Sequence, residues 1–386
     1  MKFGTLLIHN GHETDEATGA LGTPVYQTST FDRGPDFRPE NPPPPAGRLE
    51  YDYARSGNPT RKALEDSVAL LEGGSNAYAF ASGIAAVSSV LGIFSAGDHI
   101  IAAEDIYGGS YRILNTYFKR WGLDHTALSH VTPETVRAAI RPATKVLFME
   151  TPSNPLLKIT DLRACCEFAR QAGLIIIVDN TFMTPLLQRP LELGADIVVH
   201  SATKFLGGHS DVLAGIAVTK TPELGRRVYM VQNSFGAVLG PWDCFLVARG
   251  IKTLKVRLEA QQETASRLAD FFSSHKNIET VYYPGLAGHP ENEIHASQSA
   301  GPGAVLSFRT KTVEQARTFL GKTRLAATAV SLGGVETIAS YPARMSHASI
   351  PAAERERLGI TGALIRISAG LEDVDDLIED FDRSLS

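Results

Sequence analysis

The length, composition and charge of the chain limit what it can be. At 386 residues it exceeds the roughly 250–300 residues at which one hydrophobic core stops growing, so two or more domains are expected. With 43% hydrophobic and 20% charged residues, it has the composition of an ordinary globular protein. The formal net charge of −5 and the lack of a Lys/Arg-rich tract argue against nucleic acid or an anionic membrane as a partner.

The three cysteines predict neither a disulfide framework nor a metal site. Cys165 and Cys166 are adjacent in a predicted helix, Cys244 is isolated, and no Cys-x-x-Cys spacing occurs. This usage indicates a reducing, cytoplasmic setting, and the first residues lack the apolar core of a signal peptide. The uncharged window 79–97 holds four serines and three glycines, so it indicates a buried strand, turn and helix rather than a membrane span.

The first 56 residues are predicted to form an irregular arm that contributes to a neighbouring subunit. Turn-forming residues dominate it, and the proline-rich tract from Arg38 to Arg48 favours extended polyproline II. Regular structure is expected from Thr60, whose hydroxyl is a plausible N-cap for a helix that closes at Gly73 and Gly74.

Short apolar runs then alternate with helical patterns. A helix predicted over 160–173 keeps its apolar residues on one face and stops at Gly173. The predicted strands cover residues 77–80, 99–103, 145–150, 174–180, 196–201 and 213–219. Continuous apolar strands between amphipathic helices imply an α/β domain over 57–243, with a mainly parallel sheet covered on both faces.

After Pro241 the pattern changes. Residues 244–275 predict one long helix, or two joined near Gly250, and three strand-like runs and a closing helix over 374–385 follow. This arrangement predicts a smaller α+β domain over 244–386.

The familiar phosphate and acyl-transfer motifs do not explain the chain. No G-x-G-x-x-G, P-loop or G-x-S-x-G occurs, which disfavours dinucleotide binding, P-loop chemistry and a nucleophile elbow. Ser201 to Lys204 formally matches S-x-x-K, but its S-D-N and K-T-G companions are missing. Because a four-residue pattern arises easily by chance, serine acylation is disfavoured.

An acid and a lysine follow two predicted strands. Asp179 ends the run IIIVD and Lys204 follows the run DIVVH, so both fall at carboxyl edges, where open α/β sheets bind ligands. Asp179 alone could equally cap a turn. Together the two residues predict pyridoxal phosphate (PLP) chemistry, with Lys204 as the Schiff-base lysine and Asp179 keeping the pyridine nitrogen protonated.

The remaining requirements of that cofactor also have candidates. Ser82, Gly83 and Ile84 begin a predicted helix, whose N-terminus suits a phosphate, and Ser201 and Thr203 add hydroxyls beside the lysine. Tyr107 is the candidate for stacking on the ring. Arg366 interrupts an apolar strand, which is costly unless the charge is paired, so it either meets an internal acid or binds the carboxylate of an amino-acid substrate.

Nine segments together resemble a known family. They are YDYARSGNPTR, FASGIAA, EDIYGGSYR, ETPSNPLLKITD, VDNTF, HSATKFLGGHSD, AVSLGGVET, SYPARMSHASIP and LIRISAGLED. In order and from about Thr23 to the end, they are similar to the Cys/Met-metabolism (cystathionine) family of fold-type-I PLP enzymes. The main departure is the proline-rich tract in the arm.

The resemblance implies a role for each matching residue. It gives Lys204 and Tyr107 as catalytic, and it places the cofactor against Tyr53, Arg55, Ser82, Gly83, Ile84, Tyr107, Asp179, Ser201, Thr203 and Lys204, and the substrate against Asn154, Ser331 and Arg366. Tyr53 and Arg55 would reach the phosphate of a neighbouring subunit. The resemblance thus implies a homo-oligomer, a tetramer built from dimers that share active sites, and no metal.

Two positions bear on the reaction. Cystathionine γ-synthases and γ-lyases typically have a glutamate where this chain has Val330, expected to be a buried aliphatic side chain, and methionine γ-lyases typically have a cysteine where it has Gly109. The similarity is therefore greatest to bacterial cystathionine β-lyases, which implies β-elimination of L-cystathionine to homocysteine, pyruvate and ammonia in methionine biosynthesis. A γ-lyase, a γ-synthase or a bifunctional lyase is the alternative. A non-catalytic PLP-binding or amino-acid-binding protein is disfavoured because the lysine is intact.

Overall fold

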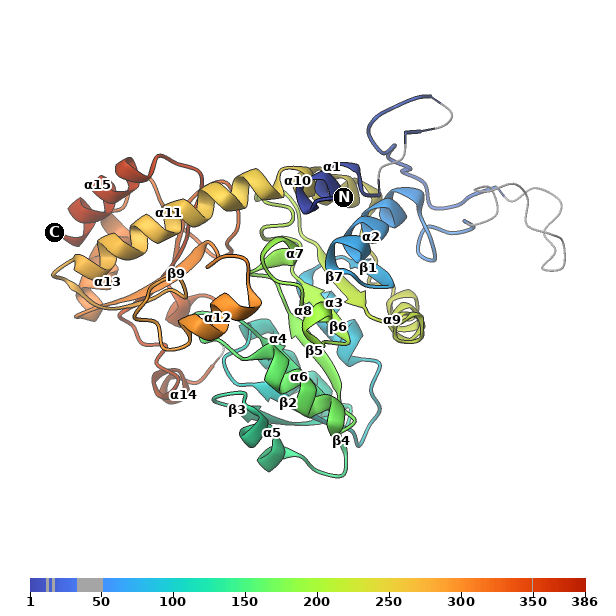
Figure 1. The fold of residues 1–386 in the computed structure, drawn as a ribbon, viewed down its shortest axis with the longest axis horizontal. Helices are drawn as coiled ribbons and strands as arrows, with labels where there is room; N and C mark the ends of the chain where they lie inside the picture. The colour runs from blue at the N-terminus through green and yellow to red at the C-terminus, as the bar shows by residue number, and fades with distance from the viewer. Residues whose placement is uncertain (12–13, 16–17, 33–50, 349) are drawn as a thin grey trace.

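Two β-sheets organise the chain, as Figure 1 shows for the computed structural model, which describes residues 1–11, 14–15, 18–32, 51–348 and 350–386. The first sheet has seven strands in the order β1-β7-β6-β5-β4-β2-β3, and the second has five in the order β10-β11-β12-β9-β8. The predicted polyproline tract lies outside the described residues. The described part of the chain contains no helix that is long and apolar enough to cross a membrane.

The seven-stranded sheet is mainly parallel, as predicted. Its strands are β1 (Asn76–Phe80), β2 (His99–Ala103), β3 (Asp124–Leu128), β4 (Thr144–Glu150), β5 (Ile175–Asp179), β6 (Ile197–His200) and β7 (Gly215–Thr219). The five strands β3, β2, β4, β5 and β6 run parallel to one another, whereas β7 is antiparallel to both β6 and β1. The sequence did not predict β3, because this half-exposed edge strand lacks a continuous apolar run.

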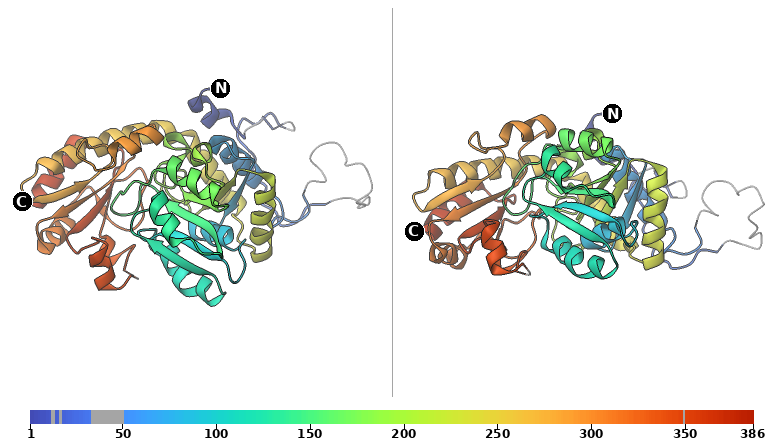
Figure 2. Two further views of the ribbon diagram at one scale, coloured as in Figure 1. Left: turned by 60° about the horizontal axis from the view of Figure 1, so that its bottom comes forward. Right: turned by 90° about the horizontal axis from the view of Figure 1, so that it is seen from below.

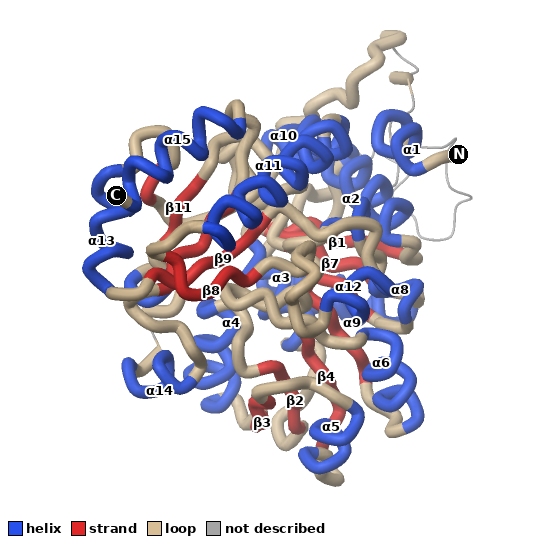
Figure 3. The backbone as a smooth tube through the Cα atoms, turned by 60° about the vertical axis from the view of Figure 1, so that its left-hand side comes forward, coloured by secondary structure: helices blue, strands red, loops and turns tan. Residues whose placement is uncertain are grey.

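Helices cover both faces of this sheet (Figure 3), which is why β2, β6 and β7 are buried throughout. They are α2 (Pro59–Glu72), α3 (Gly83–Leu91), α4 (Gly108–Ile113), α5 (Pro133–Ala139), α6 (Leu162–Gln171), α7 (Thr184–Leu187), α8 (Pro190–Leu193) and α9 (Pro222–Phe235). The predicted N-cap of α2 is wrong. Asn58 caps the helix by accepting from the amides of Thr60 and Arg61, and Pro59 occupies the first turn.

The prediction that the first 56 residues are irregular is wrong for their start, whereas the contribution of this arm to a neighbouring subunit remains a prediction. Helix α1 (Phe3–His9) forms at the start of the chain and contacts α2 and α10 (Pro241–Lys252). Leu7 of α1 is buried in the main core. The start of the chain therefore packs on its own subunit.

The second sheet lies beside the first, and helix α11 (Leu254–Ser274) runs along it toward α10 (Figures 1 and 2). Thr253 separates α10 from α11, so the prediction of two helices joined near Gly250 is confirmed. The other elements are β8 (Ile278–Tyr282), α12 (Asn292–Gln298), β9 (Val305–Thr310), α13 (Val313–Lys322), β10 (Ala327–Thr328), β11 (Ile338–Ser340), α14 (Ala352–Arg357), β12 (Leu364–Ser368) and α15 (Val374–Leu385). A domain boundary near residue 243 remains a prediction.

Candidate active site

Three parallel strands end together at the site. Glu150 and Asp179 are the last residues of β4 and β5 and are register partners, while Lys204 lies in the loop after β6. The predicted positions of Asp179 and Lys204 at the carboxyl edge are confirmed. Glu150 was missed, although it ends an apolar run just as Asp179 does.

Lys204 is the amine of this site. Its Nζ donates to Oγ of Ser331 at 2.5 Å. Burial, and to a smaller extent the charge of Arg366, lower the pKa of Lys204 to about 8. An amine with this pKa loses its proton far more readily than a surface lysine.

Hydrogen bonds between Thr203 and Ala214 close the base of the loop that carries Lys204. The amide of Thr203 donates to the carbonyl of Ala214 at 3.1 Å, and the amide of Ala214 donates to Oγ1 of Thr203 at 2.9 Å. Such closure is possible because β7 runs back antiparallel to β6. The hydroxyl of Thr203 therefore helps to hold the loop that bears the lysine.

The far part of this loop lies against α10 and α11 with almost no space between the backbones. A Cβ on Gly250 would lie 2.1 Å from the carbonyl oxygen of Gly207, and one on Gly208 would lie 2.3 Å from Cζ of Arg257. Arg257 in turn donates to the carbonyl of Gly250 at 2.8 Å. Glycine at positions 208 and 250 is what allows the contact.

Two carboxyl groups, the buried Glu150 and the partly buried Asp179, lie side by side in the site. Burial and the neighbouring Asp179 raise the pKa of Glu150 well above its usual range, and Oε2 of Glu150 accepts from the amide of Tyr107 at 2.9 Å. Burial also raises the pKa of Asp179, but hydrogen bonds from the hydroxyl (2.5 Å) and amide (3.0 Å) of Thr181 oppose this rise, as does His200. The hydrogen bonds from Thr181 therefore stabilise negative charge on Asp179, whereas burial and the neighbouring acid favour the protonated form of Glu150.

Arg366 is a buried cation that lacks a full set of partners. Its Nη1 donates to Oδ1 of Asn154 at 2.9 Å, and Nη2 donates to the carbonyl of Ser331 at 2.6 Å and to Oγ of Ser340 at 3.2 Å. Its Nε is among the buried polar atoms of the described residues without a hydrogen bond. Burial lowers the pKa of Arg366 to about 10, against the opposing effect of Glu150. The group is suited to a carboxylate brought by a ligand.

Ser331 and Val330 lie on the segment that faces Lys204. Ser331 has a positive φ of 86°, which a non-glycine residue adopts only at a cost. The expectation that Val330 is buried is wrong, since 62% of this residue is exposed. The reason is that the strained turn directs Ser331 toward the lysine and leaves its neighbour at the surface of the chain.

The predicted phosphate cradle lies at the start of α3. Ser82 is the N-cap and accepts from the amide of Ala85, so Gly83 and Ile84 occupy the first turn, where amides lack partners within the helix. A Cβ on Gly83 would lie 2.7 Å from Cβ of Ser201. Glycine therefore lets the helix N-terminus approach the segment that carries Ser201.

Tyr107 immediately precedes α4 and is 45% exposed. A Cβ on Gly109 would lie 2.4 Å from Cε1 of the Tyr107 ring, so any side chain at position 109 displaces that ring. The absence of a side chain at Gly109 thus permits the position that the ring has in this structure.

Tyr53 and Arg55 lie at the surface of the chain. Nε of Arg55 donates to Oδ1 of Asn233 on α9 at 3.2 Å, and its Cζ lies 5.4 Å from the centre of the Tyr53 ring. Tyr53 is 47% exposed. The role of both residues in a neighbouring subunit remains a prediction.

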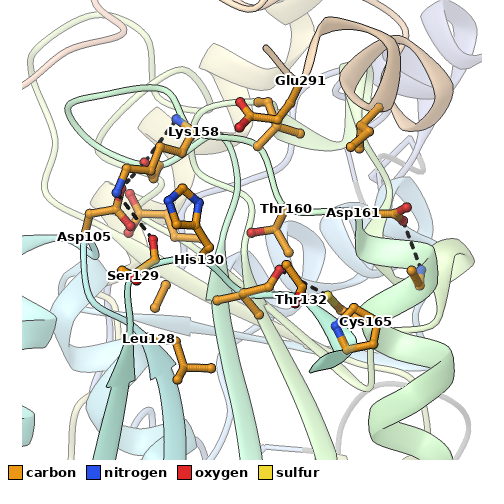
Figure 4. A pocket seen from close by; sticks show the side chains of 18 residues that line it. Asp105, Leu128, Ser129, His130, Thr132, Lys158, Thr160, Asp161, Cys165 and Glu291 are labelled. Atoms are coloured by element: carbon orange, nitrogen blue, oxygen red, sulfur yellow. Dashed lines mark hydrogen bonds and ion pairs between the residues drawn. The ribbon is translucent and has the colours of Figure 1, made fainter. Parts of the chain in front are cut away.

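A cavity of about 260 Å³ opens next to the site (Figure 4). Glu150 is part of its lining, whereas Lys204, Asp179 and Arg366 are not. On one side, Nζ of Lys158 lies 3.4 Å from Oδ2 of Asp105. The cavity is therefore a neighbour of the carboxyl pair and not the place where the lysine and the arginine meet.

The donor set fits pyridoxal phosphate. Four groups match the parts of this cofactor. Lys204 is a readily deprotonated amine for the aldehyde, and Asp179, whose charged form is stabilised by Thr181, suits the pyridine nitrogen. The exposed ring of Tyr107 suits the cofactor ring, and the start of α3, which Gly83 brings close to Ser201, suits the phosphate. The unpartnered Nε of Arg366 leaves a place for the carboxylate of an amino acid.

Comparisons with known proteins point the same way. Residues 4–386 match the family described as Cys/Met metabolism PLP-dependent enzyme. The chain is 51% identical to cystathionine β-lyase MetC of Bacillus subtilis over 99% of this chain and 95% of that protein, and 49% identical to cystathionine γ-lyase of the same organism over 100% and 99%. A crystal structure of cystathionine γ-lyase from Lactobacillus plantarum complexed with L-serine is 43% identical, with a TM-score of 0.94 and coverage of 100% and 98%. The chain therefore belongs to the Cys/Met metabolism family of PLP-dependent enzymes, and its fold is the fold-type-I fold of that family.

Proposed function

We propose that this PLP-dependent enzyme is a carbon–sulfur lyase that converts L-cystathionine and water to homocysteine, pyruvate and ammonia by β-elimination. The observation that carries the proposal is the partly buried contact of Lys204 with Ser331, beside a position 330 that holds no acid. The similarity to the β-lyase of Bacillus subtilis supports the same choice.

Lys204 is the residue that moves protons. With its pKa lowered to about 8, Nζ can take the proton from Cα of the substrate near neutral pH and return it later. Oγ of Ser331 orients Nζ through the 2.5 Å hydrogen bond. Loss of such a general base costs about 10²–10⁴-fold in rate.

The other residues hold the cofactor and the substrate. Asp179 would bind the pyridine nitrogen, Tyr107 the ring face, and Ser82, Gly83, Ile84, Ser201 and Thr203 the phosphate. When bound, pyridoxal phosphate supplies the electron sink that makes the Cα proton acidic. Arg366, oriented by Asn154, would bind the substrate carboxylate.

The choice between Cβ–S and Cγ–S cleavage depends on a second proton transfer. Cleavage at Cγ requires a further deprotonation at Cβ, and a carboxylate next to Ser331 could assist it. Val330 can neither hold a proton nor hydrogen-bond a substrate ammonium group. We therefore expect proton transfer to stop at Cα and the thiolate to leave from Cβ.

The decisive experiment compares two products. Purified enzyme supplied with PLP and L-cystathionine should release mainly pyruvate and homocysteine, with 2-oxobutyrate and cysteine as minor products. A majority of 2-oxobutyrate would contradict β-elimination and would favour a γ-lyase. That second candidate is supported by the 49% identity to the γ-lyase of Bacillus subtilis.

Two wider predictions accompany this proposal. We infer a homo-oligomer in which Tyr53 and Arg55 reach the phosphate of a neighbouring subunit, which their surface position permits. We also infer a cytoplasmic location in the methionine pathway. The three cysteines are buried thiols without a disulfide, which agrees with a reducing compartment.

A further inference from the structure

A cluster of buried polar side chains lies on the face of the large sheet opposite Asp179. Side chains alternate between the two faces of a strand, so Asn180 and His200 point away from the face that Asp179 and its register partner Val199 share. Glu72, at the end of α2, and Gln188, just after α7, complete the set. We call Glu72, His200, Asn180 and Gln188 the back-face cluster.

Glu72 is the centre of this cluster. Its Oε1 lies 2.6 Å from Nε2 of His200 and accepts from Nδ2 of Asn180 at 3.1 Å. The same Nδ2 donates to the carbonyl of Gln188 at 2.8 Å. Nε2 of Gln188 donates to Oδ1 of Asn180 and to the carbonyl of Thr151, both at 3.1 Å. Glu72 thus connects the ends of β5 and β6, and Gln188 extends the cluster from Asn180 to the end of β4.

The place of Glu72 is unfavourable for an acid. The side chains of Glu72 and His200 are both 0% exposed. Glu72 is also the last residue of α2, where the helix dipole is negative and disfavours a carboxylate. A buried acid at such a position requires specific partners, which the cluster supplies.

The cluster is nevertheless not optimised for stability. Oε2 of Glu72, Nδ1 of His200 and Oε1 of Gln188 are buried without hydrogen-bond partners among the described residues. Partly satisfied polar groups in a core destabilise the folded state relative to an apolar core. A role in positioning explains why such a set occurs beneath the site.

Each connected strand end carries a site residue next to a cluster contact. Thr151 follows Glu150, Asn180 follows Asp179, and His200 precedes Ser201. On the front face, the amide of Ser201 donates to Oγ1 of Thr181, which donates to Asp179 at 2.5 Å. A shift of His200 or Asn180 on the back face therefore moves the partners of Asp179 on the front.

We propose that Glu72 is a positioning residue that fixes Asp179 and the Ser201–Lys204 loop for cofactor binding, by holding Asn180 and His200 from the opposite face of the sheet. The proposal rests on the proposed cofactor roles of Asp179 and Lys204. It concerns the orientation and affinity of the cofactor and not the choice between β- and γ-elimination.

The test is Glu72→Gln, which keeps the size of the side chain and its acceptor oxygen but removes the charge. Glu65→Gln is the matched control, because Glu65 is another acid on α2 and its side chain is only 17% exposed. It accepts from the amide of Ala79 on β1 at 2.8 Å and belongs to no contact of the cluster. His200→Gln is a second variant that removes the imidazole. The measurements are the Kd of pyridoxal phosphate for cofactor-free protein, the visible circular dichroism of the saturated protein and its thermal unfolding.

We expect Glu72→Gln and His200→Gln each to raise the Kd about tenfold and to weaken the circular dichroism of the bound cofactor, because the pair acts as a unit. The double variant should be no worse than either single one. Glu65→Gln should match the wild type in both cofactor measurements, whatever its unfolding temperature.

A Glu72→Gln or His200→Gln protein with wild-type Kd and circular dichroism would overturn the proposal, even if it unfolded at a lower temperature. Such a result would leave β-elimination standing. Conversely, a wild-type protein that released mainly 2-oxobutyrate would contradict β-elimination and leave the positioning role of Glu72 unaffected.

Discussion

Nζ of Lys204 and Oγ of Ser331 meet at 2.5 Å although 127 residues separate them in the chain. Lys204 comes from the edge of the seven-stranded sheet, and Ser331 from a turn with positive φ beside the five-stranded sheet. Their contact joins the two halves of the chain at the proposed reacting amine. Several expected outcomes depend on this contact and on the groups around it.

The first outcome concerns the cost of burying Lys204. The pKa of Lys204 is about 8 in the folded chain, against the ordinary lysine value of 10.5. Between pH 8 and 10.5 the unfolded state therefore binds more protons than the folded state. The free energy of unfolding rises with pH through that window. Below pH 8 Lys204 is charged in the folded state, so the full cost of burying the ammonium group lowers the free energy of unfolding. In cofactor-free protein, Lys204→Met should therefore raise the free energy of unfolding at pH 7 by roughly 3 kcal/mol.

Urea unfolding of cofactor-free protein at several pH values measures this difference. The gain should shrink between pH 8 and 10.5. Lys276→Met, which replaces an exposed lysine, is the control. A Lys204→Met protein less stable than the wild type at pH 7 would show that the Ser331 contact outweighs burial.

The second outcome concerns the phosphate cradle. In Gly83→Ala the new methyl group would lie 2.7 Å from Cβ and 2.8 Å from Oγ of Ser201, so the start of α3 must move away. We expect the Kd for pyridoxal phosphate to rise roughly tenfold or more, about 1.4 kcal/mol. Gly321→Ala, where a methyl group meets no atom within 4 Å, is the control. Equal affinity in the two variants would place the phosphate elsewhere.

The third outcome separates substrate binding from cofactor binding. Arg366→Leu should retain the colour of the bound cofactor but lose roughly 2–5 kcal/mol of binding energy, which lowers kcat/KM about 30-fold to several thousand-fold. Arg309→Leu, which removes a surface pair with Glu279, should leave kcat/KM unchanged. If Arg366→Leu kept its kcat/KM, Arg366 would have only the structural role of holding Asn154 and Ser331.

The fourth outcome tests the shared site. Arg55→Ala and Lys204→Ala proteins, each nearly inactive, should regain activity when their subunits exchange, because a mixed dimer contains one site with both native residues. Random pairing restores roughly a quarter of the wild-type sites. Exchange confirmed by mass spectrometry, without recovery, would show that Arg55 serves its own chain.

The fifth outcome concerns Val330. Because this residue is 62% exposed, Val330→Glu should fold normally, with an unfolding temperature close to that of the wild type. The new carboxylate lies next to Ser331 and should raise the share of 2-oxobutyrate formed from cystathionine. Val330→Gln is the control without an acid. An unchanged product ratio in Val330→Glu would show that other residues set the reaction.

Local patterns predicted the elements that carry the site. Asp179 ends β5 and Lys204 follows β6 because uninterrupted apolar runs mark buried parallel strands, and their polar ends mark the edge where ligands bind. The edge strand β3 escaped prediction because none of its residues is fully buried, so it lacks a continuous apolar run. Helix α1 escaped it because its stability comes from packing on α2 and α10, which are distant in sequence.

Contacts between distant residues escaped prediction for the same reason. Glu72 and His200 are 128 residues apart, and neither has a neighbouring residue that indicates the other. The exposure of Val330 depends on the positive φ of Ser331. The sequence does not indicate this φ, because position 331 is neither glycine nor asparagine. The site residues themselves could be named from the sequence, whereas the groups that hold them became visible only in three dimensions.

The three-glycine contact between the lysine loop and α10 has a consequence for protein engineering. Gly207, Gly208 and Gly250 leave no room for even a methyl group without moving backbone or Arg257. Random libraries aimed at new substrates should therefore lose most variants at these positions, although Gly250 is 46 residues from Lys204 in the sequence. A grafted or truncated version of the large sheet would have to carry the α10–α11 junction with it, because that junction supports the underside of the lysine loop.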